Sequence, residues 1–470
     1  MDLRMNTYTT FVSGWTRRTS AFIALAALSL VGCKSPDEFL SVTDPDIINP
    51  ADVESAAGAD AVRLGALARL NSSTSGPVTS TGGESLFLLG GLFSDEYNNG
   101  DSFIARQEVD QRIITIQNNF LTDANRAMHR ARLAAQQAIG LEKQYNPTAP
   151  AANIAEMYFV QAYIETMMAE HYCNGLIFST VIDGVEKYGQ PITTQEAFAI
   201  ALAHADSGLA LITGTTAQDV KIKGVLQVTK GRILMNLNRY ADAATAVAGV
   251  ATSLQYQELH TATTSQQNQM WSFNVSNRRY SVSTGEGTNG LNFATANDPR
   301  LPVCLGGDAA CRAIGVTLAT RDDLTSPIYV QRLWTTNASP VTIVSGIEAR
   351  MIEAEAQLKA GQPAAALASL NAARATVTGL TPLTDPGTDA ARVDQIFRER
   401  AFWMFSTGHR TGDLRRLIRQ YGRAANSVFP TGGWHKGGNY GGDVTLPVPQ
   451  AEQNNPNLPS SATTCIDRVA

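Results

Sequence analysis

Hydrophobic side chains recur at helical spacing along most of the chain, and the pattern is clearest near the C-terminus. Between Val393 and Phe405 the apolar residues fall mostly three or four positions apart, which places them on one face of a helix. Gly408 predicts the end of this helix, because glycine readily accepts the left-handed backbone conformation found there. Asp413 is predicted to cap a following helix over about 414–421. A tail rich in glycine, proline and asparagine follows.

The same spacing predicts helices over much of the preceding sequence. Thr193 and Glu196 have the pattern of a capping box, in which each side chain accepts a hydrogen bond from the backbone of the other residue, and they predict a helix start. The helices predicted from spacing cover residues 51–70, 120–141, 151–172, 194–212, 220–237, 240–250, 347–358 and 364–373.

Small residues recur at matching places in two of the predicted helix pairs. Gly231 and Ala243 lie twelve residues apart across a turn, and so do Ala354 and Ala366. Small side chains at these positions let two helices approach closely, as in helix–turn–helix repeats of about 34 residues. A plain antiparallel helix bundle would show similar alanines and short turns.

Residues 253–345 interrupt the helical pattern. Threonine, serine, asparagine and glycine dominate, so we expect an insertion made of short strands and long loops, a kind of segment that is often functional. A second polar stretch, 93–101, is predicted to be a surface loop. The insertion also contains the aromatic residues Trp271, Phe273, Tyr280, Phe293 and Trp334, which argue against disorder.

The N-terminus has the features of a targeting segment. Two arginines precede an apolar run over 21–31, which is too short to span a bilayer. The run ends in Leu-Val-Gly-Cys, which matches a bacterial lipobox, so 1–32 is predicted to be a signal peptide and Cys33 to be lipidated. Several acyl chains on one cysteine would form a durable membrane anchor. Residues 33–50 are predicted to be an extended leader; the alternative is a plain signal peptide with an incidental cysteine.

Composition excludes some function classes. Hydrophobic residues make up 44% of the 470 residues and charged ones 17%, which is enough apolar material for a large core. The net charge is −5, and no basic run is present, so nucleic acid is not an expected partner.

The cysteines suggest disulfides rather than metal binding. Besides Cys33, four cysteines allow three pairings. We expect Cys304 to pair with Cys311, which closes a short loop, and Cys173 with Cys465, which ties the C-terminus to the helical body. No Cys-x-x-Cys or His-x-x-x-His spacing occurs, so we expect no metal site.

Catalytic motifs are absent from the sequence. It contains no nucleophile elbow, zinc-protease motif or phosphate loop, and we expect neither enzymatic activity nor a cofactor. The six histidines are isolated and are expected to be structural. Glu348 and Glu355 are predicted to lie on a helix surface. An ion-pair network bracing the C-terminal helix turn is predicted for Arg398, Glu399, Arg410 and Asp413.

The order of short motifs near the C-terminus resembles that of one protein family. Arg-Glu-Arg-Ala-Phe occupies 398–402, Gly-His-Arg 408–410 and Gly-Asp-Leu-Arg-Arg-Leu 412–417. Leu-Pro-Val-Pro at 446–449 is followed by Glu452 and by Asn-Pro-Asn. This order resembles the C-terminal signature of SusD/RagB-type outer-membrane lipoproteins.

The resemblance implies a mostly α fold built on a tetratricopeptide-repeat-like scaffold. A single domain would cover 51–470, with the helical scaffold at 51–252 and 346–422, the insertion at 253–345 and the tail at 423–470. It also implies a lipid-anchored, cell-surface protein of the outer membrane. Such a protein would capture a nutrient, usually a glycan, for a TonB-dependent transporter of the SusC type.

The resemblance places the ligand site where residues 95–107 meet the insertion. Sugar rings stack their C–H faces on aromatic side chains, and their hydroxyls pair with amides and charged groups. Candidate ligand-binding residues are Tyr97, Asn98, Trp271 and Tyr280. Each aromatic could instead pack the interior of an irregular segment.

Other residues and other functions remain open at this point. Trp403 is expected in the core, and Trp434 and Tyr440 are expected to be exposed in the tail. The alternatives to nutrient capture are a surface-tethered glycan hydrolase and a repeat scaffold that binds only proteins.

Overall fold

The computed structural model describes residues 53–78, 83–182, 185–458 and 465. The predicted signal peptide, the lipobox cysteine Cys33 and the leader 33–50 lie outside these residues. The described part from Val53 onwards forms one compact unit. Within this part, no helix combines the length and the apolar character that crossing a membrane requires.

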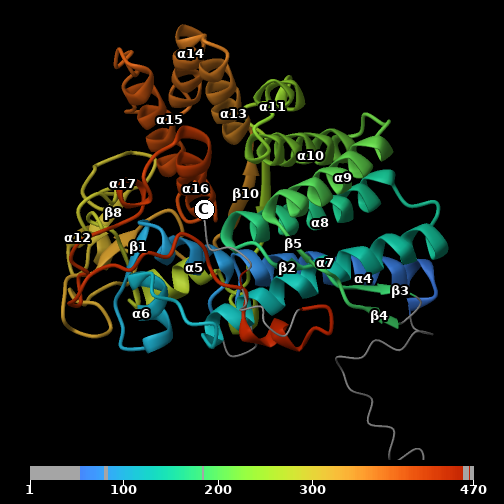
Figure 1. Cartoon of the computed structure of the whole chain (residues 1–470), viewed down its shortest axis with the longest axis horizontal. Helices are drawn as coiled ribbons and strands as arrows, with labels where there is room; N and C mark the ends of the chain where they lie inside the picture. The colour runs from blue at the N-terminus through green and yellow to red at the C-terminus, as the bar shows by residue number, and fades with distance from the viewer. Residues whose placement is uncertain (1–52, 79–82, 183–184, 459–464, 466–470) are drawn as a thin grey trace, which may run out of the picture. The chain divides into compact units, whose positions relative to one another are not determined.

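Helices dominate the structure, so the predicted fold class is confirmed (Figure 1). The capping box is also confirmed: Glu196 N donates to Thr193 Oγ1 at 3.2 Å, and Thr193 N donates to Glu196 Oε2 at 2.7 Å. The α-helices are α4 (Ala56–Thr74), α5 (Leu86–Phe93), α6 (Ile104–Gln111), α7 (Asn119–Tyr145), α8 (Ala151–His171), α9 (Thr194–Leu211), α10 (Ala217–Asn236), α11 (Tyr240–Val247), α12 (Ala309–Arg312), α13 (Gly346–Lys359), α14 (Pro363–Arg374), α15 (Asp389–Trp403), α16 (Arg410–Tyr421) and α17 (Ala425–Val428). Shorter turns of helix are η1 (Thr264–Gln266), the π-helical η2 (Trp271–Ser276) and η3 (Gln450–Asn454).

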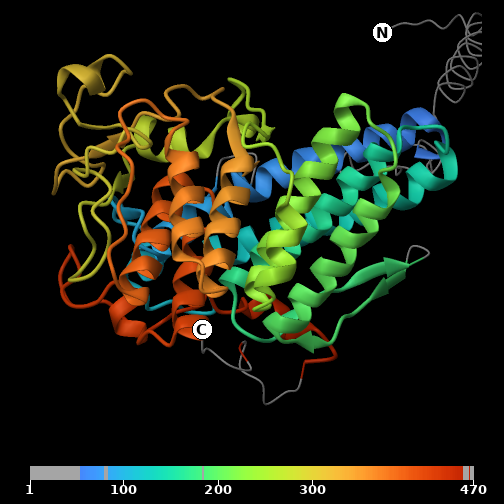
Figure 2. The same cartoon turned by 90° about the horizontal axis from the view of Figure 1, so that it is seen from above.

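Consecutive long helices pack against each other as hairpins, and the hairpins lie side by side (Figure 2). Gly231 explains one close approach: a Cβ atom there would lie 2.5 Å from Val247 Cγ1 and 3.2 Å from Ile352 Cδ1. Helix α10 can therefore contact both α11 and α13 at this point. Ala354 and Ala366 are likewise buried where α13 packs on α14.

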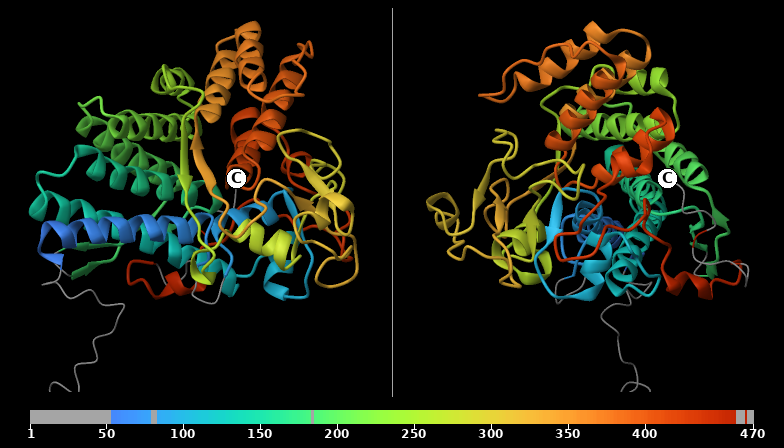
Figure 3. Two further views of the ribbon diagram at one scale, coloured as in Figure 1. Left: turned by 180° about the vertical axis from the view of Figure 1, so that it is seen from behind. Right: turned by 60° about the vertical axis from the view of Figure 1, so that its left-hand side comes forward.

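The strands are short and pair in twos, all antiparallel. Strands β6 and β10 join the two ends of the insertion 253–345, with Val341 opposite Glu258 and Ser345 opposite Gln255 (Figure 3). The insertion therefore leaves and re-enters the helical scaffold at one place. The five pairs are β1 (Tyr97–Asn99) with β7 (Tyr280–Val282), β2 (Leu176–Ile177) with β5 (Pro191–Ile192), β3 (Thr180–Ile182) with β4 (Val185–Lys187), β6 (Gln255–Glu258) with β10 (Val341–Ser345), and β8 (Val303–Leu305) with β9 (Tyr329–Gln331).

Two disulfides are present, in the pairing expected from the sequence. Cys304 and Cys311 lie with their Cα atoms 5.5 Å apart and form the centre of a small second hydrophobic core within the insertion. Cys173 follows the end of α8 and is bonded to Cys465. This bond ties the end of the chain to the helical scaffold.

Charged residues around α16 differ from expectation in three respects. Helix α16 begins at Arg410, so Asp413 lies in its first turn rather than capping it. Glu348 and Glu355 are buried rather than on a helix surface, because both face α16 and its cap: Glu348 Oε1 lies 3.2 Å from His409 Nε2, and Glu355 Oε1 lies 2.6 Å from Arg416 Nη1. Arg398 lies over the Phe402 ring, 4.8 Å from its centroid, rather than in the ion-pair network.

The ion-pair network itself is confirmed for the other three residues predicted to form it. Asp413 pairs with Arg400 at 2.8 Å and with Arg416 at 3.0 Å, and Arg416 also binds Glu355 at 2.6 Å. The remaining pairs are Glu399 with Arg300 and Arg374, and Arg410 with Asp95. Every charge in this buried network therefore has an opposite charge within bonding distance, which burial requires.

Candidate functional site

The two segments expected to form a ligand site do lie together. Strand β1 pairs with β7, with Tyr97 opposite Val282 and Asn99 opposite Tyr280. The C-terminal tail joins them, because His435 Nε2 lies 2.9 Å from the carbonyl oxygen of Asn99. We call this meeting of β1, β7 and residues 434–440 the junction.

Three of the four candidate ligand-binding residues are buried at the junction. Tyr97 and Tyr280 have no exposed surface, and their ring centroids lie 5.8 Å apart. Asn98 is also buried and donates from Nδ2 to Glu286 Oε1 at 2.6 Å. The expectation of a surface loop over 93–101 is therefore wrong. Pairing with β7 and packing against Phe405, 5.1 Å from the Tyr97 ring, turn the aromatic side chain inward.

Trp271 is the remaining candidate, and three other aromatic residues had an expected exposure that the structure tests. Trp271 opens the π-helical turn η2 and keeps part of its surface accessible. Trp434 is buried rather than exposed, and its indole Nε1 donates to Asp110 Oδ2 at 2.9 Å. Tyr440 is partly buried and donates its hydroxyl hydrogen to Glu286. Trp403 is only partly buried but packs against the main core.

Other side chains provide the accessible surface of the junction. Phe103 follows β1 and is 50% exposed. The guanidinium carbon of Arg279 lies 5.5 Å from the centre of its ring, and Arg279 Nε lies 3.5 Å from Asp322 Oδ2. On the tail, Lys436 Nζ lies 2.5 Å from Asp323 Oδ2. We call Phe103, Arg279, Asp322 and Lys436 the edge surface.

The edge surface combines an accessible aromatic ring with partly exposed charged groups. Such a combination can stack on the C–H face of a sugar and donate or accept hydrogen bonds with its hydroxyls. Sequence reasoning missed Arg279, Asp322 and Lys436, because no local spacing connects three segments so far apart in the chain. Phe103 falls within the predicted segment 95–107. It could have been recognised as a candidate because it is an aromatic residue next to a polar stretch.

Two buried carboxylates lie at the junction, because Asp110 binds Asn99 and Trp434, and Glu286 binds Asn98 and Tyr440. Burial raises the pKa of Asp110 to about 7, and burial also raises the pKa of Glu286. Burial lowers the pKa of the neighbouring His435 imidazole. Close carboxylates can act as an acid–base pair. Asp110 and Glu286 are only 1% and 3% exposed, so a polysaccharide cannot reach them in this conformation.

The described residues also line a hollow of about 310 Å³ elsewhere on the molecule. It lies between α7, the β3–β4 hairpin and η3, and most of the residues that line it are of polar types, including Asn125, His129, Glu452 and the half-exposed Tyr188. The hollow is therefore a second candidate surface for a sugar. A substitution of Tyr188 would affect binding in the hollow without changing the edge surface, so it can distinguish the two surfaces.

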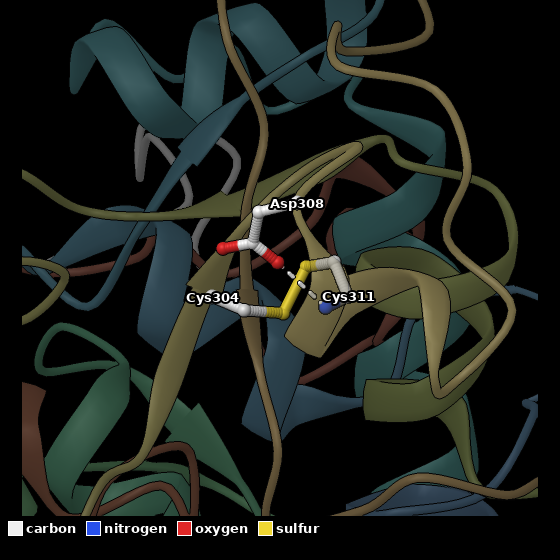
Figure 4. Close-up of side chains that lie close together, drawn as sticks. All are labelled: Cys304, Asp308 and Cys311. Carbon is white, nitrogen blue, oxygen red and sulfur yellow. Dashed lines mark hydrogen bonds between the residues drawn. A yellow bond between two sulfur atoms is a disulfide. The ribbon is translucent and has the colours of Figure 1, made fainter.

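A cysteine-containing group in the insertion does not form a metal site (Figure 4). Cys304, Asp308 and Cys311 offer ligand atoms within 4.8 Å of one another. The two sulfur atoms are bonded to each other, so neither is a thiolate, which is the form that binds metals. Asp308 Oδ1 instead caps α12 by accepting from Cys311 N at 2.7 Å.

Several solved structures have the same fold at low sequence identity. A SusD superfamily protein from Parabacteroides distasonis ATCC 8503 aligns with a TM-score of 0.63 at 12% identity, over 85% of this chain and 98% of that chain. A SusD-like carbohydrate-binding protein from Bacteroides fragilis NCTC 9343 gives 0.59 at 14% identity, over 87% and 100%. A laminarin-binding SusD-like protein gives 0.56 at 15% identity, over 86% and 98%.

Comparisons based on sequence found no relative. No family model matches the chain, and no curated protein does. The structural similarity covers nearly the whole length of the solved proteins. The chain therefore has the SusD-like fold.

Proposed function

We propose that this chain, which has the SusD-like fold, binds a glycan at the edge surface and delivers it to a SusC-like TonB-dependent transporter without altering it. The observation that carries the proposal is the match over almost the full length of solved proteins described as carbohydrate-binding. Fold likeness alone does not determine function, so the chemistry of the surface has to support it.

The edge surface supplies that chemistry. Phe103 is a half-exposed ring at the end of β1, and Arg279 lies beside it. Asp322 has 41% of its side chain exposed, so its carboxylate can accept hydrogen bonds from sugar hydroxyls. The disulfide in the insertion and the β1–β7 pairing hold the surrounding backbone, which limits the entropy lost on binding.

A glycan panel with paired variants tests where the chain binds. Native affinity electrophoresis of the purified protein, in gels containing different polysaccharides, identifies the glycan class. The Phe103→Ala/Arg279→Ala double variant should lose at least about tenfold in affinity, since both changed residues contribute to the edge surface. Tyr188→Ala, a half-exposed aromatic in the separate hollow, should bind like wild type.

The opposite pattern of affinities would assign binding to the hollow instead of the edge surface. If the double variant kept wild-type affinity while Tyr188→Ala lost it, the hollow between α7, β3–β4 and η3 would be the binding surface. If the wild-type protein bound none of the polysaccharides in the panel, the result would count against glycan capture itself.

We further propose that lipidated Cys33 anchors the protein at the cell surface of the outer membrane, beside its transporter. A C-terminally tagged full-length protein should recover a TonB-dependent transporter from gently solubilised outer membranes. Cys33→Ala should release the protein from the membrane fraction and reduce that recovery. Recovery of no transporter by the anchored wild-type protein would contradict the partner assignment.

A further inference from the structure

A cluster of potential ligands lies at the junction, where three segments that are distant in the chain meet. Asp110 comes from α6, Glu286 from the segment after β7, and His435 from the C-terminal tail. One potential ligand atom from each lies within 4.8 Å of the others. We call these three residues the tail cluster. Sequence spacing gave no sign of it, because no two of its members are close in the chain.

The orientation of the His435 ring leaves one nitrogen facing the two acids. Its Nε2 lies 2.9 Å from the carbonyl oxygen of Asn99, which can only accept, so Nε2 carries the hydrogen. Its Nδ1 lies 3.6 Å from Asp110 Oδ2 and 3.8 Å from Glu286 Oε2. Both distances are too long for a hydrogen bond. His435 Nδ1 is therefore not hydrogen-bonded to either of the two carboxylate oxygens.

Two buried oxygens, one within the cluster and one on the residue that binds Glu286, have no hydrogen-bond partner among the described residues. They are Asp110 Oδ1 and Asn98 Oδ1, on residues that are 1% and 2% exposed. Buried polar atoms are nearly always paired, and an unpaired carboxylate oxygen is costly. Positive charge near the two carboxylates comes from Arg321, which acts on both, and from Lys436, which acts on Asp110 but is itself paired with Asp323.

The other atoms of the cluster are held in place by surrounding donors. Asp110 Oδ2 accepts from Trp434 Nε1 at 2.9 Å and from Asn99 N at 3.0 Å. Glu286 accepts from Asn98 Nδ2 and from the Tyr440 hydroxyl. A histidine that donates its far N–H to a backbone carbonyl, beside hydrogen-bonded carboxylates, has the surroundings typical of a metal ligand.

We propose that the tail cluster binds one divalent transition-metal ion of the zinc class, through His435 Nδ1 and the carboxylates of Asp110 and Glu286. A tetrahedral ion with bonds of about 2.1 Å places its ligand atoms about 3.4 Å apart, close to the separations around His435 Nδ1. An imidazole ligand favours zinc over calcium or magnesium, which prefer six or more oxygens. The ion would pin the C-terminal tail to the β1–β7 pair, and this role does not depend on the ligand of the edge surface.

Zinc itself is the probe that tests this proposal. The purified protein without its predicted signal peptide is treated with a chelator, dialysed against Zn²⁺, and measured for bound metal by plasma mass spectrometry and for melting temperature. One equivalent of Zn²⁺ should bind and raise the melting temperature, because the ion binds only the folded arrangement. His435→Ala should weaken binding by at least about 100-fold, and Tyr440→Phe, which removes only a supporting hydrogen bond, by about tenfold.

A matched histidine serves as the control. His204 is also partly exposed and also pairs with a glutamate, with its Nδ1 2.7 Å from Glu165 Oε2. His204→Ala should therefore keep the stoichiometry and affinity of wild type. With Co²⁺ in place of Zn²⁺, wild type should show the visible absorption of a tetrahedral complex, and His435→Ala should lose it.

Three results would overturn the proposal. They are failure of wild type to bind one equivalent of Zn²⁺, wild-type affinity in His435→Ala, and equal loss of binding in His204→Ala. Circular dichroism of each variant shows whether it is folded. If His435→Ala does not fold, Tyr440→Phe decides, because it keeps the ring and removes only its hydroxyl.

Discussion

Asp95 is a fully buried carboxylate that follows α5 and connects three parts of the fold. Its two oxygens accept from Arg410 Nε at 2.6 Å and Nη2 at 2.7 Å, and Oδ2 also accepts from the backbone N of Leu291 at 2.8 Å. It therefore links the start of α16 to the insertion. Its neighbours along the chain gave no sign of this, because Arg410 lies 315 residues away.

Asp95→Ala should destabilise the protein by about 3–5 kcal/mol, because it leaves the buried Arg410 without its counter-charge. Urea unfolding followed by circular dichroism measures the loss. The control is Asp123→Ala, whose partner Arg126 has 55% of its side chain exposed, and it should cost less than about 1 kcal/mol. Equal losses in the two variants would contradict this role for Asp95.

Glu258 is buried on β6, and its protonation makes the stability of the fold depend on pH. It accepts from Thr74 Oγ1 at 2.6 Å and from the Ser75 hydroxyl, yet burial still raises its pKa from 4.5 to about 7. The folded state therefore binds a proton over a range in which the unfolded chain has released it. The stability that this proton provides is present below pH 4.5 and is lost as the pH rises through about 7.

Glu258→Gln should remove this part of the pH dependence, because the amide stays neutral. Relative to wild type, the variant should gain stability as the pH rises from 4.5 to 7, by roughly 3 kcal/mol at most. Denaturant titrations at a series of pH values measure the difference. Glu54→Gln, at an exposed position, is the control. A constant difference between Glu258→Gln and wild type at all pH values would refute the explanation.

At the scale of elements, helix boundaries were largely predictable because hydrophobic spacing and capping residues are local signals. Thr193 and Glu196 determined the start of α9, and it begins where they predicted. Local signals could not show which distant segment packs against a given helix or strand. Tyr97 and Tyr280 look like surface aromatics in a polar sequence, but they are buried because β1 pairs with a strand far along the chain.

The packing of α10 on α11 and α13 makes Gly231 a test of the helical scaffold. Gly231→Ala should destabilise the protein by about 1–3 kcal/mol, because the added methyl group would lie 2.5 Å from Val247 Cγ1. The control is Gly140→Ala within α7, where an added Cβ meets nothing within 4 Å, and it should stabilise by about 0.5–1 kcal/mol. Thermal unfolding distinguishes the two, and stabilisation by both would show that α10 and α11 are not closely packed.

At the scale of the whole molecule, the fold could be predicted from the sequence and the site only in outline. The ordered C-terminal motifs pointed to a SusD-like fold, and the network of Glu399, Arg410 and Asp413 shows why they matter physically: these charges bind α15 and α16 to α5, α13 and the insertion. The two segments in which the sequence placed the candidate ligand site do pair with each other, through β1 and β7. The accessible side chains were missed, because burial depends on contacts between segments that no local pattern reveals.

Binding of a glycan without cleavage of it can be tested in a single experiment. Isothermal titration of the purified protein with the glycan class identified in the panel is followed by chromatography of the recovered glycan. We expect saturable binding at one site, weakened in Phe103→Ala/Arg279→Ala, and a glycan of unchanged chain length. A shortened glycan would contradict it, and so would the absence of binding to every glycan class tested.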